Sequence, residues 1–169
     1  MEMKGLIDNI KTLTETNCDL YTEGGLIVKS PWKRFGEASF EKMEYFENLG
    51  YSLPNDLKEF LLFSNGFECV CCEQQFYSIE TIIEVAQTSK DTLRKGVYEI
   101  AYFMEDSIYI DSSLIGTGNY LFYEGSGFDS GVLLGCDFTT FLERVFLSNF
   151  SNYWRWIPEE KKCISYLIG

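Results

Sequence analysis

Histidine is absent from this chain of 169 residues. Because imidazole is the base of Ser-His-Asp and Cys-His sites and a frequent ligand of catalytic zinc, its absence excludes the usual hydrolase arrangements. Phosphate loops are missing as well. The runs Gly116-Thr117-Gly118 and Gly125-Ser126-Gly127 open no amphipathic helix and precede no Gly-Lys-Ser/Thr triplet, so they predict hairpin turns. Carboxylate pairs could serve glycosidase chemistry, but among 26 acidic residues some pairs lie close by chance. We predict a protein that is not an enzyme and binds no cofactor.

Long apolar runs and a basic leader are also missing. No apolar run approaches the roughly 18 residues of a membrane span. The first residues include Glu2 and Asp8 and do not form the basic-then-apolar pattern of a signal peptide. Hydrophobic residues make up 46% and aromatic residues 17% of the chain, which excludes an intrinsically disordered protein. The sequence predicts one domain over residues 1–169, located in the cytoplasm and without membrane contact.

Positive charge is scarce. Lysine and arginine number 14 against 26 aspartates and glutamates, which gives a formal net charge of −12. Such a surface repels nucleic acid phosphates, but it attracts basic proteins and speeds their encounter. A basic protein partner, such as a nuclease-like toxin domain, is therefore predicted, and nucleic acid binding is not. The alternative is that the acidity serves only solubility.

Six cysteines are present, and three of them cluster in Cys69-Val70-Cys71-Cys72. On a strand, Cys69 and Cys71 would face one side and Cys72 the other. There is no second Cys-x-x-Cys pair, and no histidine could complete a zinc site. Reduced, structural thiols and no metal site are predicted, with a structural zinc site as the alternative.

The hydrophobic pattern predicts an α+β fold. A first helix is expected over residues 2–15, Ser30-Pro31-Trp32 is expected to be a turn or a helix cap, and residues 67–77 are expected to form a strand. From residue 97 to 134 the period changes to two, with hairpin-length links and a turn at Glu105-Asp106-Ser107, which indicates an antiparallel meander. The whole predicts a mainly antiparallel sheet of about four to six strands with flanking helices. Ser78 and Asp137 are expected to cap helices whose apolar stripes, with that of residues 54–63, fill the core. The residues expected to be buried are Leu57, Phe60, Leu61, Ile79, Ile82, Ile83, Phe138, Phe141 and Leu142.

Residues 39–66 carry the most informative pattern. Phe40, Met43, Phe46 and Leu49 recur about once per turn, and Gly50 stands at a left-handed cap position. A second short helix opens at the proline of a Leu-Pro pair, where a fixed φ and a missing N–H are tolerated, and closes at an Asn-Gly pair. In order along the chain, the acidic, apolar and turn residues of this pattern are Glu47, Leu53, Pro54, Phe60, Leu61, Asn65 and Gly66.

This pattern resembles the core signature of the SUKH superfamily, which includes the yeast cell-wall-synthesis regulators and many bacterial immunity proteins. Two further blocks are similar to family blocks in the same order: the run 76–79, which leads from a strand into a helix, and the run 136–142, which opens the closing helix. The resemblance spans about residues 37–147, with an N-terminal helical extension over 1–30 and a C-terminal aromatic tail over 151–169. It implies that the signature residues are structural, because no motif of this superfamily is known to be catalytic.

The resemblance implies two functions of different kinds. The first is an immunity protein that neutralises a cognate bacterial polymorphic toxin by stoichiometric binding. The second is an intracellular regulator or scaffold, similar to the yeast members. Those members carry long disordered flanks that this chain lacks, which favours the first interpretation.

A strip of acidic and aromatic residues on consecutive turns is the candidate partner surface, since aromatic anchors beside charges are typical of protein interfaces. Its members are Glu105, Asp106, Tyr109, Asp111, Tyr120, Tyr123, Glu124, Phe128 and Asp129. The alternative is a set of solvated hairpin turns over a tyrosine-rich sheet. The aromatic run over 150–156 is a second candidate, although such tails more often fold back to cover the core.

Overall fold

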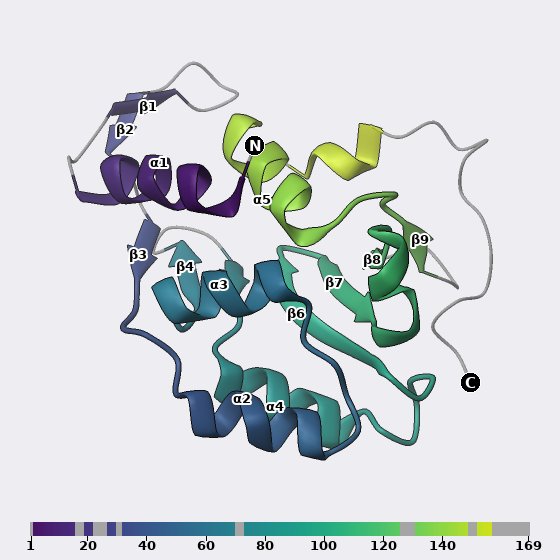
Figure 1. The fold of residues 1–169 in the computed structure, drawn as a ribbon. Coiled ribbons are helices and arrows are strands. Elements are labelled where there is room, and N and C mark those ends of the chain that lie inside the picture. Colours follow the sequence, from purple (N-terminus) through teal and green to yellow (C-terminus); the bar gives the residue numbers. More distant parts are fainter. Residues whose placement is uncertain are drawn as a thin grey trace.

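The fold is that of a computed structural model in which helices and strands are mixed along the chain (Figure 1). The structure describes residues 2–15, 19–21, 27–29, 32–69, 73–125, 131–148 and 152–156. The helices are α1 (Met3–Glu15), α2 (Phe40–Asn48), α3 (Asn55–Phe63), α4 (Ile79–Thr88), α5 (Phe138–Leu147) and the 3₁₀ turns η1 (Ser112–Thr117) and η2 (Tyr153–Trp156). The strands are β1 (Asp19–Tyr21), β2 (Ile27–Lys29), β3 (Trp32–Arg34), β4 (Phe67–Cys69), β5 (Gln74–Phe76), β6 (Val97–Phe103), β7 (Asp106–Asp111), β8 (Leu121–Gly125) and β9 (Val132–Leu133).

The main sheet contains seven antiparallel strands in the order β3-β4-β5-β6-β7-β8-β9, and β1 and β2 form a separate antiparallel pair. The α+β prediction is confirmed, with one strand more than the expected range. The difference lies at the edges. The single strand predicted over 67–77 is two strands, β4 and β5. Trp32, predicted in a turn or cap, begins β3, where it pairs with Cys69 and stacks on Phe67 with the ring centroids 5.2 Å apart.

One face of the sheet and all five α-helices share a single hydrophobic core. Helix α1 packs on α3 and α5, and α2 packs on α4 (Figure 1). At the centre, the Phe76 ring lies 5.3–6.3 Å, centroid to centroid, from the rings of Phe60, Phe103, Phe138 and Phe141. The predicted core is confirmed: eight of its nine members are fully buried, and Ile83 is partly buried against the others.

The predicted helix caps form as the side-chain chemistry requires. The Ser78 hydroxyl accepts a hydrogen bond from the Thr81 backbone N–H, and the Asp137 carboxylate accepts one from the Thr140 N–H. In α2 the predicted stripe is correct only in its middle. Met43 and Phe46 are buried, but Phe40 at the first turn is 68% exposed and Leu49 beyond the last turn is 39% exposed.

The Asn-Gly pair joins the end of α3 to the start of α4. The Asn65 side chain accepts a hydrogen bond from the Ile79 backbone N–H and donates one to the Glu80 carboxylate, both at 2.8 Å. Gly66 has φ +97°, and a Cβ there would lie 3.1 Å from the Ser78 nitrogen and 3.2 Å from the Phe76 oxygen, so only glycine fits without strain. The pair is therefore a structural connector.

The other signature residues are structural as well. The Glu47 carboxylate accepts a hydrogen bond from the Leu53 N–H and forms an ion pair with Lys58 at 2.7 Å, which fixes the connection between α2 and α3. The remaining members are buried; they are Leu53, Pro54, Phe60 and Leu61.

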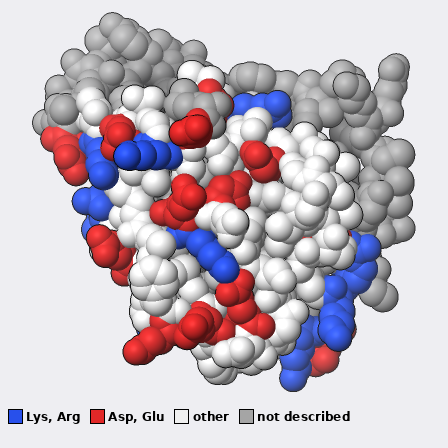
Figure 2. Space-filling view, viewed as in Figure 1, with Lys and Arg blue, Asp and Glu red and all other residues white. Residues whose placement is uncertain are grey.

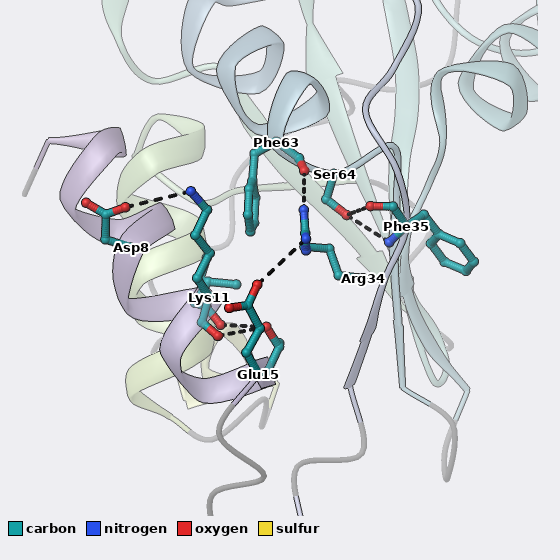
Figure 3. Close-up of polar contacts among 9 residues, drawn as sticks. Asp8, Lys11, Glu15, Arg34, Phe35, Phe63 and Ser64 are labelled. Atoms are coloured by element: carbon teal, nitrogen blue, oxygen red, sulfur yellow. Dashed lines mark hydrogen bonds and ion pairs between the residues drawn. The ribbon is translucent and has the colours of Figure 1, made fainter.

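Helix α1 is attached to the edge of the sheet through Arg34 (Figure 3). Arg34 donates a hydrogen bond to the Phe63 carbonyl oxygen at 3.0 Å and lies 3.7 Å from the Glu15 carboxylate. The Phe63 ring also has the Lys11 ammonium 5.4 Å and the Arg34 guanidinium 4.8 Å from its centroid. Together with the buried Leu6 and Ile10, these contacts hold the N-terminal helix on the domain.

Candidate interaction surface

The predicted partner strip does not form one exposed surface. Five of its nine members are buried, and for these the expectation of an accessible position is wrong; they are Asp106, Tyr109, Asp111, Tyr120 and Tyr123. Glu105 is exposed and Glu124 is half-buried. Phe128 and Asp129 lie outside the described residues. A binding role stays a prediction for the accessible members.

Asp106 is buried because the hairpin turns one residue earlier than predicted. The turn is Met104-Glu105, and Asp106 already belongs to β7, paired with Phe103 on the core face. One of its oxygens accepts hydrogen bonds from the Trp154 indole N–H at 2.7 Å and the Asn152 amide at 3.0 Å. Arg155 donates to both oxygens at 2.8 Å. The carboxylate therefore holds η2 against the sheet.

The other buried members are also held by partners within the domain. Asp111 ends β7, accepts two hydrogen bonds from Ser113 and forms an ion pair with Arg94. The Tyr120 hydroxyl lies 2.6 Å from the Asp56 carboxylate and accepts a hydrogen bond from the Phe138 N–H. The contacts of Tyr120, which directly precedes β8, join this strand to the starts of α3 and α5. Both residues therefore stabilise the fold and are not available to a partner.

Tyr123 lies on the core face, and its ring centroid is 6.3 Å from that of Trp154. The alternation of residues 106, 108 and 110 could have revealed the orientation of Asp106, because Ile108 and Ile110 share its face and are both in the core. Trp154 is fully buried, which confirms for this residue the interpretation that the aromatic run folds back over the core; residues 150–151 lie outside the described residues.

The opposite face of the sheet, called here the outer face, has a different character. A continuous row of cross-strand neighbours crosses six strands on it, and no α-helical residue belongs to its hydrophobic cluster among the described residues. The row is Lys33, Glu68, Gln75, Tyr102, Ser107 and Glu124. All six side chains are exposed or half-buried. The sheet therefore presents polar groups, two of them acidic and one basic, on the side away from the helices.

A second row of the outer face is less accessible. Glu99, Tyr109 and Phe122 are cross-strand neighbours there, and Tyr77 donates a hydrogen bond to Glu99 at 2.7 Å. Burial raises the pKa of the Glu99 carboxyl, and burial together with the hydrogen bond to Glu99 raises the pKa of Tyr77. Tyr109 donates a hydrogen bond to Glu124, and its pKa is also raised by burial. The tyrosines of this row are neutral hydrogen-bond donors to carboxylates.

Two hollows interrupt the outer face. The outer hollow, of about 560 Å³, is lined by residues 35–37, 65–66, 68, 75–78, 80 and 81. The second hollow, of about 280 Å³, is lined by residues 68–69, 73–75 and Tyr102. Glu68 and Gln75 line both hollows, so the two hollows are neighbours between the Asn-Gly connector and the β6–β7 hairpin. Sequence reasoning missed this surface because its members come from five separate segments.

Glu80, on the wall of the outer hollow, gives a test of the local electrostatics. Partial burial by itself raises its pKa, but hydrogen bonds from Lys42 and Asn65 outweigh that effect and bring the pKa to about 2. Since the pKa is lowered by folding, the stabilisation is complete above the ordinary value of 4.5 and is lost as the pH falls towards 2. We expect Glu80→Gln to lower the urea midpoint at pH 7, with the difference from wild type closing between pH 5 and 2.

The effect should be modest, because the Glu80 side chain is 42% exposed and the ion pair is screened by water. Glu84→Gln, an exposed position on the same helix, is the matched control for loss of one charge. If the difference in urea midpoint between Glu80→Gln and wild type stayed constant from pH 7 to 2, the lowered pKa of Glu80 would be contradicted.

Within the described part of the chain, no group of three or more His, Cys, Asp or Glu side chains is arranged to hold a metal ion. Cys69 is buried and is not part of a disulfide, while Cys71 and Cys72 lie outside the described residues. Cys136 is buried too, and burial raises the pKa of its thiol to about 11, which leaves it protonated at neutral pH. None of the described helices combines the length and apolar character needed to cross a bilayer.

Comparison with known proteins agrees with the fold and the signature. The model of the SMI1 / KNR4 family (SUKH-1) matches residues 41–151, which is more than half of the chain and runs from α2 past the end of α5. The matched region contains the connector at Asn65-Gly66 and both hollow-forming strands, β4 and β5. No significant match to a curated protein was found. The chain belongs to the SMI1/KNR4 family (SUKH-1).

Proposed function

We propose that this protein is an immunity protein, which neutralises a cognate bacterial toxin in the cytoplasm by forming a stoichiometric complex with it. Membership of the SMI1/KNR4 family (SUKH-1) supports a non-catalytic role, because proteins of this family are generally non-enzymatic immunity proteins or regulators. Binding without chemistry implies occlusion, in which one molecule of the protein covers the active surface of one toxin molecule.

The observation that carries the choice of partner is the excess of negative charge. The formal net charge is −12, and no histidine adds positive charge at lower pH. Toxins that cut nucleic acids hold phosphates with lysine and arginine, so their active surfaces are basic. An acidic protein is attracted to such a surface from a distance and reaches it at a high rate. The same charge disfavours contact with nucleic acid itself.

The proposal is tested by expressing the protein encoded in the adjacent reading frame in a bacterial host, alone and with this protein. We expect toxicity from the neighbouring protein alone, rescue on co-expression, and a complex of one to one stoichiometry by calorimetry. In a titration of the toxic activity, protection should be complete at one molar equivalent. The association rate should fall as salt is raised from about 50 to 500 mM, because screening shortens the range of the attraction.

Two outcomes would overturn the proposal. Complete protection at well below one equivalent would exclude occlusion. Absence of both rescue and complex formation for the proteins encoded on either side would exclude an immunity role and favour the regulator or scaffold function.

A further inference from the structure

We infer that the outer face, from the outer hollow to the β6–β7 hairpin, is the docking surface for the partner, and that the partner is a protein presenting lysine and arginine side chains to it. This inference rests on the proposed function for the identity of the partner as a basic toxin. Accessibility, charge and an exposed apolar residue support the assignment of the surface itself.

Accessibility distinguishes this face of the sheet from the face that the helices cover. The helices cover the core face, whereas the row from Lys33 to Glu124 remains exposed or half-buried across six strands. The two hollows lie along this row and meet at Glu68 and Gln75. A partner could therefore insert one side chain into each of two neighbouring hollows.

Most charged side chains on this face are acidic. Its carboxylates are those of Glu37, Glu68, Glu73, Glu99 and Glu124, and the basic residue of the row, Lys33, is already paired with Glu68 at 3.3 Å. Glu37 and Glu73 are exposed. On the side where α2 and α3 lie in front, by contrast, acidic and basic side chains are interleaved (Figure 2). Lysines and arginines gather there over the connection between α4 and β6, which contains Lys90, Arg94 and Lys95. Charge complementarity therefore selects the outer face for a basic partner.

Met104 supplies an apolar contact at the hairpin end of this face. It is 52% exposed and has φ +58°, a left-handed conformation that glycine adopts without strain and methionine does not. Its backbone N–H donates a hydrogen bond to the Glu73 carbonyl oxygen, so the methionine is fixed next to the second hollow. Methionine is enriched in interface cores and adapts its shape to a partner. We assign it as the apolar anchor beside the two hollows.

The first experiment uses nona-arginine peptide as the probe and two matched sets of substitutions. The outer set is Glu37→Gln, Glu68→Gln, Glu73→Gln and Glu124→Gln. The helix set is Glu41→Gln, Glu44→Gln, Glu59→Gln and Glu84→Gln, all at exposed positions of α2, α3 and α4. Each set removes four negative charges, so the formal net charge changes from −12 to −8 in both.

In NMR titrations of the full chain at about 50 mM salt, the peptide should shift amide signals of β4, β5 and β6. The outer set should weaken binding at least tenfold, and the helix set less than threefold. Equal weakening by both sets would show that only overall charge matters and would overturn the inference. Shifts confined to α2 and α4 would overturn it too. Circular dichroism and thermal unfolding verify that both sets fold.

The second experiment measures the complex with the adjacent-frame protein, using Met104→Gly. Glycine suits the positive φ, so the variant should unfold at the wild-type temperature or above it, while dissociation from the partner becomes at least fivefold faster. An unchanged dissociation rate would overturn the role of Met104. If the outer set binds and protects as wild type does, the surface inference fails while the proposed function stands. If the peptide maps to the outer face but no neighbouring protein is neutralised, the proposed function fails and the acidic docking surface for a basic partner stands.

Discussion

Replacement of Trp154 by alanine is expected to lower the free energy of unfolding by about 3–5 kcal/mol, the usual range for a large buried aromatic. Trp154 has no exposed surface, although it lies in the last described segment of the chain. Its ring centroid is 5.2 Å from that of Phe103 and 5.5 Å from that of Phe141, so it closes the aromatic core from the C-terminal side. Its indole N–H also donates to Asp106. Truncation removes both the packing and this hydrogen bond.

Urea and thermal unfolding measure the effect, which for a domain of this size corresponds to a fall in Tm of roughly 6–20 °C. Leu147→Ala is a matched control, because that leucine is a large apolar residue of the neighbouring helix α5 and is 79% exposed. It should change stability by less than about 0.5 kcal/mol. Trp154→Phe should fall between the two, since it keeps most of the packing but loses the N–H donor. A Trp154→Ala variant as stable as Leu147→Ala would contradict the assigned role of η2.

The helices could be predicted because their signals are local. In α4, a serine cap and apolar residues at Ile79, Ile82 and Ala86 suffice to place the start and the buried face. The three-residue strand β3 could not be predicted in the same way. It carries no periodic pattern and forms only because Trp32 and Arg34 pair with a strand more than thirty residues later in the chain. Propensity is a weak guide where pairing is non-local.

The side chains of β6 do not alternate strictly between the two faces, for a physical reason. Strict alternation places Tyr98, Ile100 and Tyr102 on one face, but the register shifts between Glu99 and Ala101. This irregularity keeps Ile100 and Ala101 both in the core and sends Tyr102 to the outer face. The row that carries the candidate surface therefore could not be found from alternation alone. Its composition also gave no signal, since the acidic residues come from separate strands.

The positions of the buried tyrosines were also hard to predict from the sequence. Tyr120 was assigned to the partner strip because it follows a glycine-rich turn, yet its hydroxyl bonds to Asp56, which lies 64 residues earlier in the sequence. No local sequence pattern predicts such a hydrogen bond between distant residues. Aromatic residues beside charges are typical of interfaces, but the same combination also occurs where a hydroxyl satisfies a carboxylate inside a domain.

Asp106→Ala is expected to lower the free energy of unfolding by about 2–4 kcal/mol, which is large for a residue predicted to lie on a surface turn. The substitution leaves the buried indole N–H of Trp154 without its acceptor and removes two hydrogen bonds to Arg155. The Arg155 side chain is 45% exposed and can turn towards water, so the unsatisfied indole makes the larger contribution. The expected loss is measured by urea unfolding at pH 7.

Glu105→Ala is the matched control, since it removes the neighbouring carboxylate in the same hairpin. That side chain is 66% exposed and lies 3.7 Å from Arg155, so its ion pair is screened and its loss should change stability by less than about 0.5 kcal/mol. The two variants carry the same change in charge at adjacent positions, but Asp106 is buried on the core face and Glu105 is exposed in the turn. Equally small losses of stability in the two variants would show that Asp106 is exposed on the surface and not buried. An Asp106→Ala variant that kept its stability but lost the adjacent-frame partner would make it a binding residue after all.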